Sequence, residues 1–405
     1  MRKLTIVFFE AGGGHRNAAD ALKITLETQR HPWQVSLLNI QELLDSLDVV
    51  RSTTGVRLQD VYNLILRKGW TRLTPQLLVL LQGIIRLYHA RTVRALQKYW
   101  DDNPPDLVLS VIPHFNRALA ESVSMTQIPF VTLLTDLADY PPHFWIERQS
   151  QYIICGTEYA VRQALAMGHH KERIFRTSGM ILKPNFYEKP IANRFSESWR
   201  SEREALGLDP ALRTGVVLFG GHGSPAMVDI AQLLDQSDNG VQLIMLCGHN
   251  QKLAAELKAR PTRMPMLVEG FTSRVAHFMS LADFFIGKPG PGCISEALQF
   301  DLPVIVECNA KTLPQERYNA EWLIEKRLGL VLNSFQEIAS GVGQLLDAST
   351  FSELQANAKG YSNRALFEVP GILDEILEES VPRSTVDEGI LQPMDWRPRP
   401  AWASL

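Results

Sequence analysis

The sequence predicts an α/β protein built from two doubly wound domains. Short apolar runs alternate with helix-forming segments along most of the chain, which is the pattern of β–α–β units around a parallel sheet. At 405 residues the chain is too long for one ordinary hydrophobic core. A polar, proline-containing stretch at 181–201 is expected to be a linker. We therefore predict an N-terminal domain at 1–180, a C-terminal domain at 202–380 and a tail rich in Pro and Trp at 381–405.

The composition is that of a soluble globular protein, with 45% hydrophobic residues, 21% charged residues and a formal net charge of −3. The cysteines are scattered without a C-x-x-C pair, which argues against a zinc site or a disulfide framework and fits a reducing cytosol. They are Cys155, Cys247, Cys293 and Cys308. The apolar run at 5–9 is too short for a signal-peptide core, and no stretch of 18 uncharged apolar residues exists. A cytoplasmic protein without a membrane span is expected.

The first predicted strand, at 4–9, ends in a glycine turn that carries a histidine. The turn reads EAGGGHRN (residues 10–17) and leads into an Ala-rich helix. Asn17 occupies the place of the third glycine in a dinucleotide fingerprint, and the next strand ends at Asn39 instead of an acidic residue, so an NAD enzyme is disfavoured. His15 lies at the edge where open α/β sheets bind ligands and is a candidate general base. The alternative is a helix-start histidine bonded to the backbone.

Residues 49–100 form a strongly basic segment. They hold nine basic residues and one acidic residue, so the charge is 9 − 1 = +8, whereas the whole chain carries −3. Apolar and aromatic residues are interleaved, as in segments that dock on anionic lipid. The residues expected to contact a membrane or lipid acceptor are Arg67, Lys68, Trp70, Arg72 and Arg86. The alternative is a basic helical face over a core; nucleic acid is not expected, because no recognisable reading motif accompanies the charge.

Three more apolar runs complete the first half, at 107–111, 130–135 and 152–155. Asp136 comes directly after the second of them. If the sheet is parallel, Asp136 lies on the same edge as His15. We expect its carboxylate to orient or support the base, and the alternative is a capping or turn residue.

Five apolar runs predict the sheet of the second half, at 214–219, 241–246, 266–268, 284–286 and 302–306. Each ends at glycine or a small polar residue, so a rim of exposed backbone is expected along one edge. The turn at 220–224, which contains Gly221, is expected to face the phosphates of a nucleotide from one side. A single final helix is predicted at 352–379.

The fourth of these strands leads into a turn with the sequence KPGPG (residues 288–292), and a helix follows from Cys293. A strand that feeds such a turn and a helix aims free backbone N–H groups and the positive helix end at one point, which makes an anion site suited to phosphate. Glu296, one turn into the helix, is placed to accept hydrogen bonds from both hydroxyls of a ribose. Taken alone, the turn also fits a plain strand–helix connection, and Lys288 fits a solvated loop lysine.

Taken together and in order, these motifs resemble a known family. Residues 12–16 (GGGHR) resemble the N-terminal signature of the galactolipid synthases, and residues 134–137 (LTDL), followed by His143 and Trp145, resemble their TD loop. Residues 288–298 (KPGPGCISEAL), with 302–303 (LP) and 314–316 (PQE), are similar to the donor motif. The resemblance covers about residues 4–375. It is to the inverting, family 28-like GT-B glycosyltransferases that include the monogalactosyldiacylglycerol synthases, the bacterial processive diacylglycerol glucosyltransferases and the lipid II-forming N-acetylglucosaminyltransferase.

The resemblance implies a GT-B fold, with two Rossmann-like domains facing across a cleft, and it implies roles for single residues. The diphosphate would be held by Gly290, Pro291, Gly292, Cys293 and Ile294, the ribose by Glu296, and the sugar hydroxyls by Gln315 and Glu316. The backbone near Phe271 would bind uracil, and Gly14 and Gly221 would lie beside the UDP-sugar. His15 would be the base or its close neighbour, assisted by Asp136.

The implied activity is transfer of a hexose from a UDP-sugar to a diacylglycerol-type lipid at a membrane surface, with inversion. No metal or cofactor is expected, because backbone N–H groups would stabilise the leaving group and no convincing Asp-x-Asp pair lies near the site. Three alternatives stay open: a UDP-sugar epimerase on the same fold, a transferase with a polyprenyl or other acceptor, and an inactive membrane-bound scaffold. His222 and residues 306–312 depart from the galactolipid synthase pattern, which leaves the sugar and the acceptor open.

Overall fold

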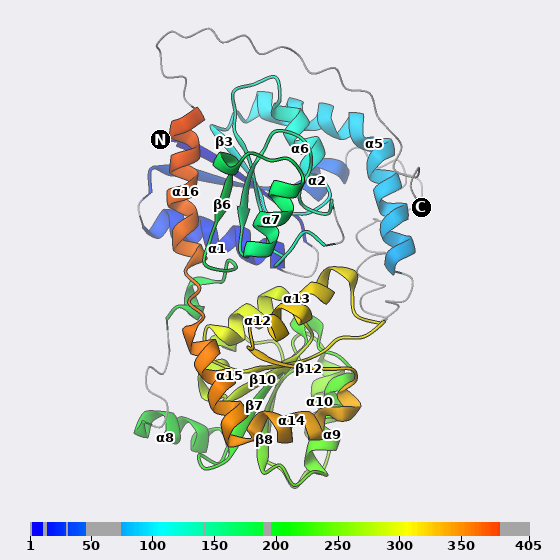
Figure 1. Cartoon of the computed structure of the whole chain (residues 1–405), viewed down its shortest axis with the longest axis vertical. Coiled ribbons are helices and arrows are strands. Elements are labelled where there is room, and N and C mark those ends of the chain that lie inside the picture. Colours follow the sequence, from blue (N-terminus) through cyan, green and yellow to red (C-terminus); the bar gives the residue numbers. More distant parts are fainter. Residues whose placement is uncertain are drawn as a thin grey trace.

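The computed structural model describes residues 2–10, 14–29, 31–45, 74–140, 143–188 and 196–380. They form two domains, each built around a six-stranded sheet. Figure 1 shows the N-terminal domain stacked on the C-terminal domain along the long axis of the molecule. The predicted α/β architecture of two doubly wound domains is confirmed.

The N-terminal sheet has the strand order β2-β1-β3-β4-β5-β6, and all its pairs are parallel. Its strands are β1 (Arg2–Phe8), β2 (Trp33–Asn39), β3 (Leu107–Ser110), β4 (Phe130–Leu133), β5 (Tyr152–Cys155) and β6 (Ile174–Arg176). Every residue of β3 and β4 is buried, as expected for central strands covered on both faces. The strand order reverses between β1 and β3, so this sheet has its switch point there.

Helices cover the two faces of this sheet. They are α1 (Gly14–Thr28), α2 (Ile40–Asp45), α5 (Thr74–Asp102), α6 (Asn116–Val123) and α7 (Glu158–Ala166). In α1, Ala18, Leu22 and Leu26 recur at helical spacing and are buried. Burial of this stripe holds the start of α1, and with it His15, at the carboxyl end of β1.

The C-terminal sheet has the order β12-β11-β10-β7-β8-β9, again with parallel pairs only. Its strands are β7 (Arg213–Leu218), β8 (Val241–Leu246), β9 (Met266–Glu269), β10 (Phe284–Gly287), β11 (Val304–Glu307) and β12 (Gly329–Leu332). Its helices are α8 (Glu197–Ala205), α9 (Ala226–Asp235), α10 (Gln251–Ala259), α11 (Val275–Leu281), α12 (Pro291–Leu298), α13 (Pro314–Glu325), α14 (Ile338–Leu346) and α15 (Ala348–Gly360). The switch point lies between β7 and β10.

The prediction of one final helix at 352–379 is wrong, because the structure has two helices there. Helix α15 ends at Gly360, and α16 (Ala365–Ser380) begins after a short non-helical stretch. The Asn363 side chain accepts a hydrogen bond from the Ala365 N–H (3.1 Å) and donates one to the Met180 carbonyl (2.8 Å). These side-chain bonds compete with the helical backbone and fix the break.

Helix α16 crosses back to the N-terminal domain, although the sequence analysis placed residues 202–380 in the C-terminal one. Four of its side chains are fully buried in the N-terminal core: Leu366, Val369, Leu373 and Ile376. Asp374 accepts hydrogen bonds from Arg2 (2.8 Å) and Trp33 (2.9 Å) of that domain. Figure 1 shows α16 running along the side of the upper domain, and it contacts α1.

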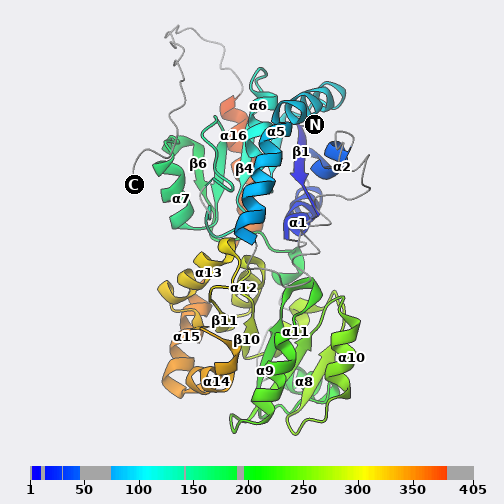
Figure 2. The same cartoon turned by 90° about the vertical axis from the view of Figure 1, so that its right-hand side faces the viewer.

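Helix α5 contains the second half of the basic segment. Figure 2 shows it on one face of the N-terminal domain, reaching down to the boundary between the domains. Leu87 is 79% exposed, and the exposed basic side chains of this helix are Arg86, Arg91, Arg94 and Lys98. The other predicted membrane contacts, Arg67, Lys68, Trp70 and Arg72, lie outside the described residues. None of the helices in the described ranges has the length and apolar character needed to cross a bilayer.

Candidate active site

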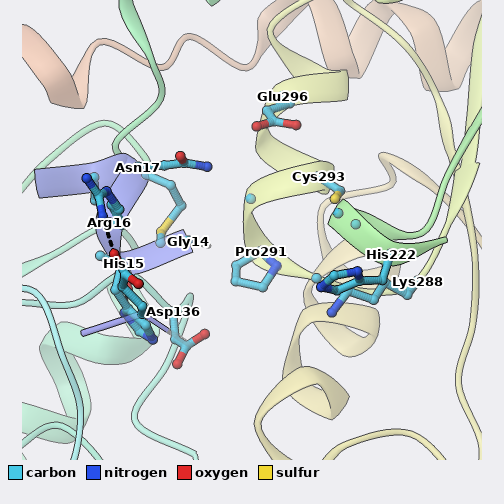
Figure 3. A pocket seen from close by; sticks show the side chains of 18 of the residues that line it. Gly14, His15, Arg16, Asn17, Asp136, His222, Lys288, Pro291, Cys293 and Glu296 are labelled. Atoms are coloured by element: carbon cyan, nitrogen blue, oxygen red, sulfur yellow. Dashed lines mark hydrogen bonds and ion pairs between the residues drawn. The ribbon is translucent and has the colours of Figure 1, made fainter. Parts of the chain in front are cut away.

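A cleft of about 2310 Å³ lies between the two domains. One wall is made by the loops after β1, β3 and β4, and the other by the loops after β7, β8, β9 and β10. Both walls therefore lie at the switch points of their sheets, where neighbouring loops diverge and leave a crevice. Figure 3 shows His15 and Asp136 on the first wall, facing Pro291 and Glu296 on the second.

His15, the second residue of α1, is half-buried on the N-terminal wall. Its Nδ1 lies 2.8 Å from the Val111 carbonyl oxygen and 3.0 Å from the Thr135 hydroxyl. Because a carbonyl only accepts, Nδ1 carries the proton and Nε2 keeps a lone pair. Burial lowers the pKa of His15 to about 4 in spite of the Val111 bond, so the imidazole is neutral near pH 7. From the sequence, a backbone-bonded histidine is the alternative to a general base. His15 makes that backbone bond and is also neutral with an unprotonated Nε2, which is the form that a general base requires.

Asp136 follows Thr135 on the same wall, but its carboxylate is not bonded to His15. Its Oδ2 accepts a hydrogen bond from Trp145 Nε1 at 2.8 Å. The orienting contact predicted for Asp136 is therefore made by the Val111 carbonyl instead. Burial raises the pKa of Asp136 to about 7, partly offset by the Trp145 bond. A carboxylate so placed can still stabilise positive charge that develops beside it.

Apolar side chains line the part of the cleft that α2 and α5 border. This apolar strip consists of Ile40, Leu44, Ile85, Tyr88, Pro113 and Phe115. Helix α2 also contacts α5 directly. The N-terminal wall therefore combines a polar centre at His15 with an apolar approach from the side of the basic helix.

The C-terminal wall contains the predicted strand–turn–helix anion site. Within the turn, the Gly290 N–H bonds the Lys288 carbonyl (2.8 Å), and the Ile294 N–H bonds the Gly290 carbonyl (3.1 Å). The Ile294 side chain is fully buried and its N–H is bonded to Gly290, so its predicted role in holding the diphosphate stays a prediction. In the described part of the chain, the N–H groups of Gly292 and Cys293 remain without a backbone partner at the start of α12. Those two groups are the donors available to an anion.

Glu296 lies one turn further along α12, on the same side of the helix as Pro291 in Figure 3. Burial raises the pKa of Glu296 to about 7, and the positive charge of Lys183 from the domain connection opposes that shift. This is the position predicted for the ribose ligand. Burial raises the pKa of the Cys293 thiol to about 12, so this residue contributes its backbone and not a nucleophilic sulfur.

Lys288 is not the solvated loop lysine that the turn alone suggested. Its Nζ lies 2.7 Å from Glu316 Oε1, and the Glu316 side chain is only 9% exposed. Gln315 Oε1 is buried and has no hydrogen-bond partner within the described ranges, so a ligand hydroxyl would satisfy it. Within those ranges no group of three or more His, Cys, Asp or Glu side chains is arranged to hold a metal ion. Lys288 is thus paired with a carboxylate, and the start of α12 and Lys311 add positive charge to this wall.

An aromatic platform stands at the far end of this wall, where uracil is expected. Phe271 is 68% exposed and stacks on His249, with ring centroids 4.0 Å apart and a 17° interplanar angle. The His249 N–H donates to the Gly221 carbonyl at 2.8 Å. Gly248 has φ +59°, and a Cβ there would come within 2.3 Å of that carbonyl, so only glycine fits. The turns after β7 and β8 are thereby locked together.

Sequence reasoning did not select His114, His249 or Lys288, all of which line the cleft. The two histidines follow β3 and β8, so taking the polar residue after every parallel strand would have found them. The same rule finds Lys288, which directly follows β10, but not its partner Glu316, which is 28 residues away.

Comparison with known proteins identifies relatives over most of the chain. Residues 15–180 match the family model described as monogalactosyldiacylglycerol (MGDG) synthase. The chain is 26% identical over 403 residues to the chloroplastic monogalactosyldiacylglycerol synthase of Spinacia oleracea, covering 94% of this chain and 73% of that protein. It is 25% identical over 321 residues to the processive diacylglycerol beta-glucosyltransferase of Bacillus subtilis, covering 74% and 77%.

Solved structures share the fold at lower identity. The calicheamicin glycosyltransferase CalG4 superimposes with a TM-score of 0.62 at 13% identity, covering 94% of this chain and all of that one. The UDP-GlcNAc 2-epimerase of Neisseria meningitidis gives a TM-score of 0.57 at 16% identity, covering 93% of this chain and all of that one. Because a transferase and an epimerase share this fold, the fold alone does not choose between the reactions.

The sequence relatives favour a transferase, since one is named a monogalactosyldiacylglycerol synthase and the other a diacylglycerol beta-glucosyltransferase. The structure agrees with a glycosyltransferase as well, because it has two Rossmann-like domains facing across a cleft and an anion site on the C-terminal wall. The chain is therefore a GT-B glycosyltransferase, and its sequence is similar to the monogalactosyldiacylglycerol synthases and the processive diacylglycerol glucosyltransferases.

Proposed function

We propose that this enzyme transfers a hexose from a UDP-sugar to the hydroxyl of a diacylglycerol-type lipid, with inversion at the anomeric carbon. One observation carries the proposal: a neutral imidazole with a free Nε2 faces an anion site across the cleft. A base on one side and a leaving-group site on the other are what in-line displacement requires.

In the proposed reaction, the acceptor oxygen attacks the anomeric carbon while Nε2 of His15 takes the hydroxyl proton. The new C–O bond forms as the bond to the β-phosphate oxygen breaks, and UDP departs with the bonding electron pair. The imidazolium that forms is stabilised by the nearby Asp136 carboxylate. The N–H groups of Gly292 and Cys293, together with the positive end of α12, stabilise the charge on the diphosphate.

We infer that the transfer needs no metal ion, because the positive start of α12 and its backbone N–H donors at Gly292 and Cys293 already serve the diphosphate site. Extensive dialysis against EDTA should leave the rate of transfer unchanged. Loss of activity that Mg²⁺ or Mn²⁺ restores would contradict this inference.

The lipid acceptor is supported by the apolar strip, which opens toward α5 and its exposed basic side chains. Amphipathic surfaces of this kind bind peripherally to anionic bilayers. The relatives reported above are named for diacylglycerol products or acceptors. The four cysteines are free thiols, which fits a reducing compartment such as the cytosol. We therefore place the enzyme peripherally on a membrane surface facing the cytosol.

The decisive experiment incubates the protein with a panel of radiolabelled UDP-hexoses and a total lipid extract, and separates the products by polarity. We expect label in a glycolipid whose anomeric configuration is inverted relative to the donor. Label in a polyprenyl product would show that the acceptor is a polyprenyl lipid and not a diacylglycerol. Absence of any labelled lipid would refute the proposal. Incubation with UDP-N-acetylglucosamine alone tests the epimerase, which would release an isomerised nucleotide sugar.

A further inference from the structure

We propose that His114 binds the lipid acceptor: its ring N–H donates to an acceptor oxygen next to the reacting hydroxyl and so positions that hydroxyl against His15. The inference rests on the proposed function and adds a residue to it. An ester carbonyl or ether oxygen on the carbon neighbouring the hydroxyl is the chemical class of partner.

The backbone of His114 is held in a conformation that L-residues rarely adopt. Its φ is +69°, in the left-handed region that favours glycine. Its N–H donates to the Phe144 carbonyl at 2.8 Å, and its ring meets the Phe144 ring edge-on with centroids 3.9 Å apart. Such a conformation persists only where the surroundings enforce it, and it is concentrated at functional sites.

Two buried side chains make this support rigid. The Asn116 amide donates to the carbonyls of Ile112 (3.0 Å) and Trp145 (2.9 Å), which ties together the loops on either side of His114. The Asp139 carboxylate accepts the N–H groups of Phe144 (2.8 Å) and Trp145 (2.7 Å). The imidazole is therefore presented to the cleft from a fixed base and not from a mobile loop.

The ring itself is available to a ligand. It lines the cleft, is only half-buried, and makes no hydrogen bond to any residue in the described ranges. Burial lowers the pKa of His114 to about 4, and repulsion by the neighbouring His15 adds to this effect, so the ring is neutral near pH 7. A neutral imidazole has one N–H to donate, which suits an uncharged oxygen better than a phosphate.

The position of His114 along the cleft points to the acceptor and not the donor. It lies between Pro113 and Phe115, two members of the apolar strip, and close enough to His15 for the charge of His15 to lower the pKa of His114. An amphiphile with its tail on the strip and its hydroxyl at His15 places its intervening polar atoms at His114. The UDP-binding groups are on the opposite wall.

The test compares His114→Gly with His143→Gly. Both histidines have a positive φ (+69° and +65°), so glycine removes the same side chain and relieves the same backbone. His143 is exposed and does not line the cleft, which makes it the matched control. With diacylglycerol in mixed micelles, we expect His114→Gly to raise the acceptor KM about tenfold, as for one lost hydrogen bond, with UDP affinity unchanged. His143→Gly should keep the wild-type acceptor KM.

A second variant tests the hydrogen bond itself. Asparagine tolerates a positive φ and keeps an N–H donor, so His114→Asn should recover part of the acceptor affinity. Equal acceptor KM in the two glycine variants, or no recovery with asparagine, overturns the assignment. If the wild-type protein binds UDP but glycosylates no lipid, the proposed function fails and this inference with it; normal wild-type transfer with an unaffected His114→Gly removes only the inference.

Discussion

His15 keeps its proton on Nδ1 because the Nδ1–H donates a hydrogen bond to the Val111 carbonyl. This leaves Nε2 unprotonated and available for catalysis. His15→Ala should therefore lower kcat by about 10²–10⁴-fold, the usual contribution of a general base. Affinity for UDP, measured by calorimetry, should stay at the wild-type level because the nucleotide site is on the other wall. His31→Ala, three residues beyond the end of α1, serves as the control. Near-normal turnover of His15→Ala would show that the base is another group.

Glu296 offers a carboxylate where a ribose diol would lie, so its loss should weaken donor binding and not the chemical step. We expect Glu296→Ala to raise the donor KM by roughly 10–100-fold, the effect of removing hydrogen bonds to a charged group. Gln299→Ala, at the C-cap of the same helix, should leave the donor KM unchanged. A titration that gives the same UDP-sugar affinity for Glu296→Ala and wild type would retire the ribose assignment.

The raised pKa of Asp136 has a consequence for stability. Its folded-state pKa of about 7 lies above the ordinary aspartate value of 3.8, so the folded protein binds more protons than the unfolded chain between those pH values. Stability is therefore lost through this group as the pH rises from about 4 to about 7. Asp136→Asn keeps an acceptor for Trp145 but has no charge to bury. The melting temperature of Asp136→Asn minus that of wild type should increase from pH 5 to pH 8. The rate of transfer should be lower in the variant. A melting-temperature difference that does not change with pH would contradict this prediction.

How far single residues could be predicted depended on local signals. His15, Asp136 and Glu296 each follow a parallel strand or open a helix, so position in the sequence was enough to place them on the cleft. Ile294 packs its side chain into the core, and the face of a helix that packs inward is decided by tertiary contacts; its role at the diphosphate stays a prediction. The partner of Lys288 and the strained backbone of His114 depend on the folded chain and leave no mark in a local window.

At the scale of elements, α5 is the part of the described chain that we expect to meet the membrane. Each basic residue near an anionic surface contributes about 1 kcal/mol, so Arg86→Glu with Arg94→Glu should weaken binding to anionic vesicles by roughly 30-fold or more. The same change of charge on α10, Lys252→Glu with Lys258→Glu, is the control. Co-sedimentation with phosphatidylglycerol and phosphatidylcholine vesicles measures the effect. Equal binding of wild type to both lipids would dismiss the membrane surface.

Most strands were predictable because a buried parallel strand reads as an uninterrupted apolar run bounded by turn residues. The break between α15 and α16 was not, since residues 352–379 keep helix-forming character on both sides of it. What ends α15 is the bond from Asn363 to the Met180 carbonyl, and Met180 lies in the other half of the sequence. Hydrophobic periodicity cannot predict a hydrogen bond to a residue as distant in the sequence as Met180.

At the scale of the whole molecule, α16 makes the N-terminal domain depend on the last helix of the described chain. Leu373 is fully buried in the N-terminal core, so Leu373→Ala should lower the free energy of unfolding by about 2–5 kcal/mol. Glu375→Ala, exposed on the same helix, should have little effect. Chemical denaturation measures the change, and UDP affinity of the folded protein should persist because the nucleotide site is in the other domain. Equal stabilities would mean that α16 is not part of that core.

Length, the polar stretch at 181–201 and the repeated strand–helix units were enough to predict two domains, and the resemblance implied that they face each other across a cleft. The return of α16 to the first domain was not predictable, because its apolar stripe fits either core and only the three-dimensional arrangement decides.

The chain crosses between the domains twice, near residue 180 and near residue 363, and hydrogen bonds join the two crossings. Besides the Asn363–Met180 bond, the Ser178 hydroxyl accepts from the Arg364 N–H (2.7 Å) and the Glu368 carboxylate accepts from the Ser178 N–H (2.7 Å). Two linked tethers leave a pair of rigid bodies little freedom except rotation about the line that joins them. The walls can then swing apart to exchange product for substrate without sliding past each other. In such a rotation the linked crossings would return the imidazole of His15 to the same point opposite the nucleotide site, whichever ligand is bound.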